Sequence, residues 1–388
     1  MISEVARGSA GTMARSETYL DWNATTPLRP EAAAAMSAVF TRCGNPSSVH
    51  RCGRATRQVV DHARSAVGAV VNAPPEGVVF VSGGTEANHL ALLGPKRDRV
   101  LVSGVEHDSV LRAVPEAERI PVDRDGVVLL DALDRLLAGD SRRALVSVMY
   151  ANNETGVVQP VAAIAAIARA HGALFHCDAV QAAGKIPLDA KAVGADLFTL
   201  SAHKLGGPAG VGALVVTDEL ELTPLLRGGG QEGGRRAGTE NVAGIAGFAA
   251  AALAAVQEIA VYDRVHALRD ALEAEILAIA PDAVVLSAGA PRLPNTAAIA
   301  MAGVAAETQV VALDLDGVMV SAGAACTSGK VGPSHVLEAM GVGPDLVRST
   351  IRVSLGWNSS EADVAHFLRA WSALYRRCRG SSFGARAA

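Results

Sequence analysis

The chain has 388 residues, of which 50% are hydrophobic and 19% charged, so it can bury a large core in two or three domains, or in one large domain with a smaller one. This composition excludes a chain that is disordered along its whole length. The formal net charge is −4, and such a near balance of charges argues against a nucleic-acid polymer or an anionic membrane as the main partner.

The cysteine content indicates a reducing environment. The five cysteines form an odd set without a CxxC pair, and they are Cys43, Cys52, Cys177, Cys326 and Cys378. We therefore expect reduced thiols rather than a disulfide framework or a structural zinc site. The first 18 residues contain no apolar signal-peptide core, and the longest apolar stretch, 242–256, is shorter than the roughly 18 residues that cross a bilayer. These features predict a cytoplasmic protein without a membrane partner.

In chain order, residues 1–17 are small, polar and unpatterned, and we expect them to be a loose tail. Short β-branched runs then alternate with segments of helical period, such as a helix predicted over 161–172, which ends in a glycine. The predicted strands cover residues 99–104, 144–151, 173–180, 196–202 and 212–217. This alternation indicates an α/β fold whose largely parallel sheet is covered by helices on both faces.

Beyond residues 238–244 the pattern changes. A long alanine-rich helical stretch reaches about Ile279, and shorter elements follow it up to a last amphipathic helix from Glu361 to about Arg377. We expect a second, smaller domain that the chain enters through the long helix, and a loose tail over 381–388.

The segment SGGTEANHLALLG, residues 82–94, opens a predicted helix directly after the apolar strand VVFVS. Exposed N–H groups at a helix start, beside the hydroxyl of Thr85, form an anion site suited to phosphate. An ordinary helix with Thr85 as its N-cap explains the same residues.

Two other polar residues end predicted strands. Asp178 follows the apolar run of FHCDAVQAAGK, where its carboxylate needs either a protonated heterocyclic nitrogen as a partner or the next loop to cap. Its neighbour Cys177 is expected in the core. Lys204, in SAHKLGGPAG, is a candidate for a Schiff base, with a surface lysine as the alternative. A phosphate site, an aspartate and a lysine at the strand ends of one parallel sheet are together what pyridoxal phosphate needs.

Two further residues are candidates for substrate chemistry. Cys326 lies in GAACTSGK, a loop of small residues after the strand VMVS, and this setting favours a reactive thiol over a structural one. The composition of 322–332 predicts a loop that can swing. Arg352 alternates within the strand of STIRVSLG, and an arginine on a half-buried strand usually meets a carboxylate.

These motifs, in this order, resemble those of the NifS/IscS-like cysteine desulfurases, which are pyridoxal-phosphate enzymes of the class V aminotransferase group. The resemblance covers roughly residues 18–378 and includes YLDWNATTP, VEHDSV, ANNETGVVQP, RRAGTEN and ACTSGK. It implies the aminotransferase-like fold type I, with a large cofactor-binding domain over 24–260 and a mainly parallel sheet. It also implies a smaller α+β domain made of 18–23 and 261–380.

The resemblance implies a role for each residue around the cofactor ring. Lys204 would hold the cofactor covalently, and Asp178 would keep the pyridine nitrogen protonated. Gln181 would contact the ring hydroxyl, Asn153 would help hold ring and substrate, and His107 would stack on the ring and move protons.

The remaining roles concern the phosphate, the substrate and sulfur. The phosphate would be bound by Gly84, Thr85, Ser201 and His203, with Thr239 contributed by the other subunit of a homodimer. Arg352 would clamp the substrate carboxylate, and Cys326 would be the nucleophile that forms a persulfide. Cys326 would also serve transiently as an iron–sulfur ligand shared with a scaffold protein.

The chain departs from the family pattern at five positions, none of which carries a catalytic group: Ala209, Gly230, Gly233, Ala324 and His89. The implied reaction converts L-cysteine to L-alanine and passes sulfur through the enzyme cysteine to an acceptor protein, in iron–sulfur assembly or in thiolation of a tRNA or a cofactor. An aminotransferase or a selenocysteine lyase on the same fold is the nearest alternative, and a non-catalytic sulfur-transfer scaffold is another. The Cys326 loop argues against the aminotransferase, and Lys204, Asp178 and His107 argue against the scaffold.

Overall fold

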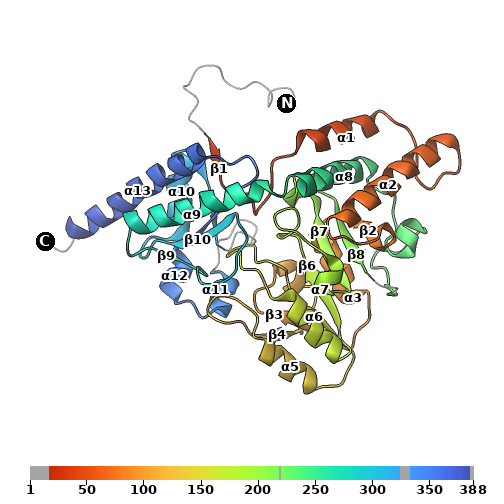
Figure 1. The fold of residues 1–388 in the computed structure, drawn as a ribbon, viewed down its shortest axis with the longest axis horizontal. Coiled ribbons are helices and arrows are strands. Elements are labelled where there is room, and N and C mark those ends of the chain that lie inside the picture. Colours follow the sequence, from red (N-terminus) through yellow and green to blue (C-terminus); the bar gives the residue numbers. More distant parts are fainter. Residues whose placement is uncertain (1–16, 218–219, 324–332, 385–388) are drawn as a thin grey trace.

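A mostly parallel sheet of seven strands forms the centre of the larger part of the molecule (Figure 1). The structure, a computed structural model, describes residues 17–217, 220–323 and 333–384. The strand order is β2-β8-β7-β6-β5-β3-β4, and only β8 runs antiparallel to its neighbours. The bounds are β2 Val78–Val81, β3 Arg99–Ser103, β4 Glu118–Ile120, β5 Ala144–Ser147, β6 Leu174–Asp178, β7 Leu197–Ser201 and β8 Gly212–Val216.

Both faces of this sheet are buried, because side chains that alternate along its strands pack against different sets of helices. Val78 and Phe80 of β2 belong to the core that includes α2, α5, α6 and α8, whereas Val79 and Val81 pack with α3 and α4. The helices of this part are α1 Pro30–Phe40, α2 Arg51–Ala69, α3 Gly84–Leu93, α4 Asp108–Leu111, α5 Leu130–Ala138, α6 Val161–Ala170, α7 Ala190–Val193 and α8 Val242–Gln257. Single 3₁₀ turns are η1 Pro75–Gly77, η2 Ala202–Lys204 and η3 Gln231–Gly234. The predicted α/β class is confirmed.

A smaller part, built mainly from the last third of the chain, has its own sheet and its own core. Its four-stranded sheet has the order β12-β13-β10-β9 with antiparallel pairing, and β1 pairs with β11 beside it. The strands are β1 Thr18–Tyr19, β9 Val284–Val285, β10 Thr296–Ala300, β11 Val318–Met319, β12 Ser321–Ala322 and β13 Thr350–Ser354. The helices are α9 Val261–Ile279, α10 Ala306–Leu315, α11 His335–Ala339, α12 Pro344–Ser349 and α13 Glu361–Gly384. Leu20, near the start of the chain, belongs to this core, so the two ends of the chain fold together.

The prediction of one long helix that reaches Ile279 is wrong in one respect, because the segment forms two helices, α8 and α9. The chain leaves helical geometry at Glu258, where φ is −98° and ψ is 11°, and α8 and α9 meet at an angle of 74°. The physical reason is packing: α8 lies against α1 and α2, whereas α9 lies against α13 and β10. One straight helix cannot bury its apolar residues in both cores.

Among the residues described here, no helix alone has the length and apolar composition to cross a membrane. Only the bent α8–α9 pair, taken together, has both the length and the composition.

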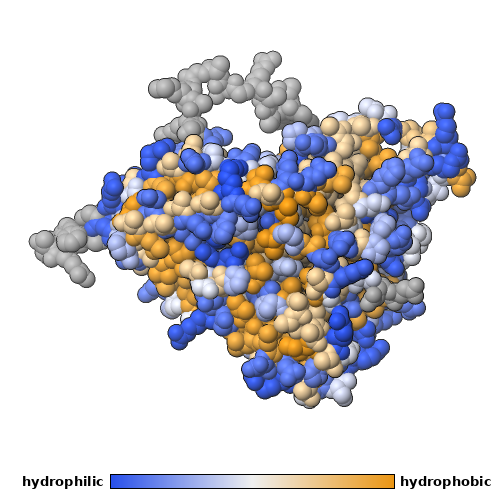
Figure 2. Space-filling model, in the orientation of Figure 1, coloured by the Kyte–Doolittle hydropathy of each residue, from blue (hydrophilic) through white to orange (hydrophobic). Residues whose placement is uncertain are grey.

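Two other predicted boundaries also move. The last helix runs to Gly384 rather than to about Arg377, so residues 381–384, expected in a loose tail, are helical. Strand β5 ends at Ser147 rather than at residue 151, although the backbone N–H groups of Val148 and Tyr150 still donate to β6 before the loop that carries Asn153. Figure 2 shows hydrophilic residues distributed over both parts of the molecule, with hydrophobic residues between them.

Candidate active site

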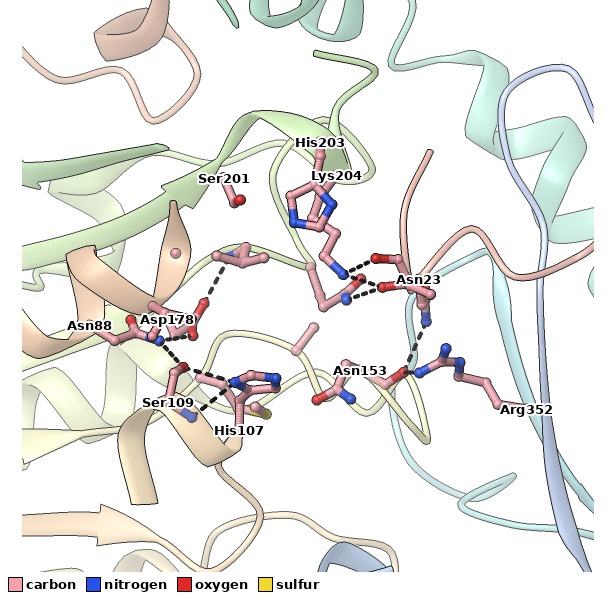
Figure 3. Close-up of a pocket in the computed structure, with 17 residues that line it drawn as sticks. Asn23, Asn88, His107, Ser109, Asn153, Asp178, Ser201, His203, Lys204 and Arg352 are labelled. Carbon is pink, nitrogen blue, oxygen red and sulfur yellow. Dashed lines mark hydrogen bonds between the residues drawn. The ribbon is translucent and has the colours of Figure 1, made fainter. Parts of the chain in front are cut away.

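A cavity of about 330 Å³ lies at the C-terminal ends of β6 and β7 and is lined from both parts of the molecule (Figure 3). In a parallel sheet this edge is where ligands bind, and the volume lies within the range of about 300–1,000 Å³ usual for ligand sites. Most of the site residues predicted from the sequence line it: Gly84, Thr85, His107, Asn153, Asp178, Gln181, Ser201, His203, Lys204 and Arg352. Thr239 is exposed and does not line this cavity in the single chain, and Cys326 with residues 324–332 lies outside the described residues.

Asp178 is the last residue of β6, and its carboxylate is buried at the floor of the cavity. Oδ2 accepts a hydrogen bond from Asn88 Nδ2 at 2.8 Å, and Oδ1 accepts one from the backbone N–H of Val180 at 3.0 Å. Burial raises the pKa of this carboxyl, and the hydrogen bonds and the nearby His107 and Lys204 act against the increase. The ionised form therefore gains from any cation that enters the cavity.

His107 lies on the same side of the cavity and is held by the turn that it begins. It is the N-cap of α4, and its Nδ1 accepts from the backbone N–H of Ser109 at 3.1 Å and lies 2.8 Å from Ser109 Oγ. Ser109 Oγ in turn accepts from Asn88 Nδ2 at 2.8 Å, so its own proton goes to the histidine. Burial lowers the pKa of His107, and a neutral ring with an occupied Nδ1 carries its proton on Nε2.

Lys204 follows β7 in a single 3₁₀ turn, which projects its side chain into the cavity. Nζ donates to the carbonyl oxygens of Asn23 at 2.5 Å and Ala24 at 2.7 Å, both on the segment after β1. Its amine thus lies on the same cavity as the Asp178 carboxylate (Figure 3). These backbone contacts hold the amine without neutralising it.

The start of α3 forms one corner of the cavity. Its N-cap, Gly83, contributes no side-chain cap, so the alternative in which Thr85 is the N-cap is wrong, and Thr85 lies within the first turn. A Cβ on Gly84 would approach Val180 Cγ2 at 3.3 Å and Ser201 Cβ at 3.6 Å, so glycine keeps the helix start close to the strand ends. With the side chains of Ser201 and His203 beside it, this corner has the donors that an anion needs. Burial lowers the pKa of His203 to about 4.

Arg352 enters from the smaller part of the molecule, on the central strand β13. Nη2 pairs with Asp21 Oδ1 at 2.6 Å, and Nη1 donates to the carbonyl oxygen of Asn153 at 3.0 Å. The expected carboxylate partner is therefore present. Nε is buried, and no protein atom of the described residues accepts from it. The Arg352 side chain lines the cavity, and a guanidinium there is suited to a substrate carboxylate.

Three polar residues of the site were missed by sequence reasoning. Asn88 joins Asp178 to Ser109, and Asn23 joins Lys204 to Asn153. Asn88 lies one helical turn after Gly84, so helical spacing from the phosphate motif was a usable signal for it. For Asn23 and Ser109 the sequence offered only their nearness to quoted motifs.

The residues present fit pyridoxal phosphate. The buried carboxylate of Asp178 suits a cationic ring nitrogen. The start of α3, which has no side-chain cap, suits a phosphate. A primary amine lies on the same cavity. One ligand with a ring nitrogen, a carbonyl carbon and a phosphate satisfies all three.

The fold and the cavity define an enzyme with a two-part α/β architecture and a site at the edge of a parallel sheet. The family model for the aminotransferase class-V enzymes matches residues 18–367, and this family depends on pyridoxal phosphate. The chain is 43% identical over 386 residues to a cysteine desulfurase of Cereibacter sphaeroides, covering 95% of this chain and 98% of that one. It is 38% identical over 380 residues to the cysteine desulfurase IscS of Dictyoglomus turgidum, covering 94% and 96%.

A solved structure agrees with these sequence relatives. The NifS-like protein of Rickettsia africae superimposes with a TM-score of 0.87 at 34% identity, over 93% of this chain and 99% of that chain. The chain therefore belongs to the aminotransferase class-V family, within its NifS/IscS-like branch. The resemblance inferred from the motifs is confirmed.

Proposed function

We propose that this protein is a pyridoxal-phosphate-dependent cysteine desulfurase that converts L-cysteine to L-alanine and transfers sulfur to Cys326. The observation that carries the proposal is the meeting, on one cavity, of the buried Asp178 carboxylate, the Lys204 amine and the Arg352 guanidinium. The cysteine desulfurases among its relatives span nearly the whole chain and support the choice of reaction.

The residues around the ring have distinct tasks in this proposal. Lys204 holds the cofactor through Nζ, Asp178 pairs with its ring nitrogen, and Gln181 donates to its ring hydroxyl. Gly84, Thr85, Ser201 and His203 bind the phosphate. When bound, the cofactor supplies an electron sink that stabilises negative charge at Cα of the substrate.

The substrate is oriented by Arg352 and Asn153, and its protons are moved by Lys204 and His107. The Arg352 guanidinium binds the substrate carboxylate, which places Cα near Lys204 and the sulfur toward the open side of the site. Lys204 Nζ takes the proton from Cα, and His107 Nε2 exchanges protons with the substrate amine and sulfur.

Sulfur leaves the substrate by attack of the Cys326 thiolate. The new S–S bond forms as the Cβ–S bond breaks, and the electron pair of that bond stays on Cβ, which a proton converts to the methyl group of alanine. The enzyme keeps a persulfide, and no further oxidant is needed because the substrate carbon is reduced as the sulfur is oxidised. The persulfide then passes to the thiol of an acceptor protein.

Further parts of the proposal concern partners. We infer a homodimer in which Thr239 of one subunit reaches the phosphate of the other, and the exposure of Thr239 in the single chain supports this. An acceptor such as an iron–sulfur scaffold, transient iron–sulfur ligation by Cys326, and a cytoplasmic location stay predictions. So do the domain bounds of 24–260 and 261–380.

The test is a single-turnover reaction of the purified protein with pyridoxal phosphate and L-cysteine. We expect one alanine per site and one sulfur atom trapped on Cys326, found by mass spectrometry after alkylation. Cys326→Ala is expected to keep the cofactor absorbance and lose the trapped sulfur, with Cys43→Ala as the matched control at an exposed cysteine. Alanine formation without any enzyme-bound sulfur, or sulfur on another cysteine, would contradict the proposal.

A selenocysteine lyase is the second candidate, because its substrate differs from L-cysteine only by selenium in place of sulfur. A comparison of L-selenocysteine with L-cysteine in the Cys326→Ala variant separates the two. A lyase needs no enzyme thiol, so it keeps its rate with selenocysteine, whereas the proposed desulfurase loses its reaction with cysteine.

A further inference from the structure

Lys185 is a buried amine that the proposed reaction does not use. It is 2% exposed and does not belong to the cavity lining. Nζ donates to Gln181 Oε1 at 2.7 Å and to Asn23 Oδ1 at 3.1 Å. The preceding Gly184 has φ of +69°, and a Cβ there would lie 2.7 Å from Leu205 Cδ2. Only glycine suits this position, and the backbone conformation that it allows directs the Lys185 side chain into the interior.

The charge state of this amine follows from its surroundings. Burial lowers the pKa of Lys185 well below its ordinary range, and the positive charges of Lys204 and Arg352 lower it further. Both hydrogen-bond partners are neutral amide oxygens. A neutral amine still donates two hydrogen bonds, so the contacts persist without a buried charge.

These contacts decide which way the Gln181 amide points. Since Oε1 accepts from Lys185, the Nε2 group must lie on the other side, where it donates to the backbone oxygen of Asn23 at 2.9 Å. That same oxygen accepts from Lys204 Nζ at 2.5 Å. Gln181 lines the cavity, and Nε2 has a second N–H, so the amide offers a donor rather than an acceptor to a ring bound there.

The same logic fixes Asn23. Its Oδ1 accepts from Lys185 and from Asn295 Nδ2 at 3.0 Å, so its Nδ2 donates to the carbonyl oxygen of Asn153 at 3.2 Å and to Thr296 Oγ1 at 2.9 Å. The Asn153 carbonyl also accepts from Arg352. Asn23 therefore links Lys204, through the Asn153 carbonyl, to the arginine on β13, as Figure 3 shows.

We propose that Lys185 is a positioning residue, which orients the amides of Gln181 and Asn23 so that their N–H groups face the cofactor ring and Asn153. This inference rests on the proposed function and deepens it. Lys185 touches neither cofactor nor substrate and acts through Gln181 and Asn23.

The test compares Lys185→Met, Gln181→Met and the double variant in the holoenzyme. Methionine fills similar space but donates no hydrogen bond. We expect Lys185→Met to weaken binding of pyridoxal phosphate about tenfold, because the freed Gln181 amide can rotate and present its oxygen to the ring hydroxyl. Its visible absorbance band should also shift, which a purely structural change would not cause. The double variant should bind no more weakly than Gln181→Met alone.

A matched control is Lys191→Met, which makes the same change at an exposed lysine on α7 and should alter neither affinity nor absorbance. Additive losses in the double variant, or a lower unfolding midpoint with unchanged affinity and absorbance, would overturn the inference. If Lys185→Met does not fold, Lys185→Leu, which also donates no hydrogen bond, serves for the same cycle. A wild-type protein that binds no pyridoxal phosphate overturns the proposed function itself, whereas normal wild-type binding with unchanged Lys185 variants overturns this inference alone.

Discussion

The two sides of the cavity hold their charged groups in opposite ways. On the large-sheet side, the carboxylate of Asp178 accepts hydrogen bonds from neutral donors, the Asn88 amide and a backbone N–H. On the small-sheet side, the guanidinium of Arg352 already pairs with the Asp21 carboxylate at 2.6 Å. The negative charge of Asp178 can therefore still pair with a positive charge on a ligand. The guanidinium of Arg352, in contrast, is already paired and is fixed in one orientation.

Under the proposed function, this difference gives the two parts of the molecule separate tasks. Groups at strand ends of the parallel sheet are positioned for chemistry, because burial moves their pKa values and hydrogen bonds orient them. The arginine on the antiparallel strand is positioned for recognition, because both ends of its guanidinium are held. We therefore expect substitutions on the large-sheet side to lower the rate of alanine formation, and substitutions on the small-sheet side to weaken the binding of cysteine.

The largest effect is expected at the amine of the parallel-sheet side. Lys204→Ala removes the group that moves the substrate proton, so alanine formation should fall by at least about 10³-fold. Pyridoxal phosphate should still bind non-covalently through the phosphate corner. Alanine assay and ultrafiltration of the cofactor measure the two results, and Lys191→Ala is the control at an exposed lysine. Undiminished alanine formation would remove Lys204 from the chemistry.

Asp178→Asn keeps the shape of the side chain and removes its charge, so we expect about a 10²–10³-fold loss of alanine formation.

The same substitution should increase the stability of the cofactor-free protein at high pH. A carboxyl whose pKa is raised by folding stabilises the protein at low pH and loses that contribution as the pH rises through the folded pKa. The neutral amide should thus raise the unfolding midpoint of the cofactor-free protein at pH 8. A lower midpoint at that pH would show that the carboxylate is not strained by burial.

Arg352→Lys tests the small-sheet side. Lysine keeps a positive charge but loses the fork that spans Asp21 and Asn153. We expect KM for cysteine to rise about 10–100-fold, with the cofactor retained, since one ammonium group cannot contact Asp21, the Asn153 carbonyl and the substrate carboxylate together. Steady-state kinetics with cofactor absorbance check this. A loss of the cofactor rather than of substrate affinity would erase the contrast between the two sides.

The buried carboxyl group of Glu106, next to His107 in the chain, should make the stability of the protein depend on pH. Burial raises its pKa to about 8 from the usual 4.5, so the folded state keeps a proton that the unfolded state releases. Its contribution to stability is fully present below pH 4.5 and declines up to about pH 8, by at most about 1.4 kcal/mol per pH unit. Glu106→Gln should flatten this decline in denaturant titrations. Parallel profiles for the two proteins would show that Glu106 ionises normally.

The smallest effect is expected at a departure from the family pattern. Ala209 is exposed on the turn after Lys204, so Ala209→Lys should change the free energy of unfolding by no more than about 0.5 kcal/mol. Cofactor affinity should stay within error of the wild type. A tighter complex would mean that this turn belongs to the phosphate site.

The sequence alone determined the fold class and most of the residues on the cavity. Asp178 and Lys204 were found because a polar residue after an apolar run marks a strand end, and strand ends of one parallel sheet meet at one edge. Cys177 was correctly expected in the core, and Arg352 met the expected carboxylate. Each of these inferences depends on neighbours in the chain or on a motif with fixed spacing.

Tertiary structure alone decided how those residues are held. Asn23 contacts Lys185, Asn153 and Asn295, which are more than a hundred residues away in the chain, so no local pattern points to it. The break between α8 and α9 was equally invisible, because no glycine or proline marks it and two separate cores impose it. Local sequence sets periodicity and strand ends, whereas the partners of a buried polar group are set by which surfaces pack together.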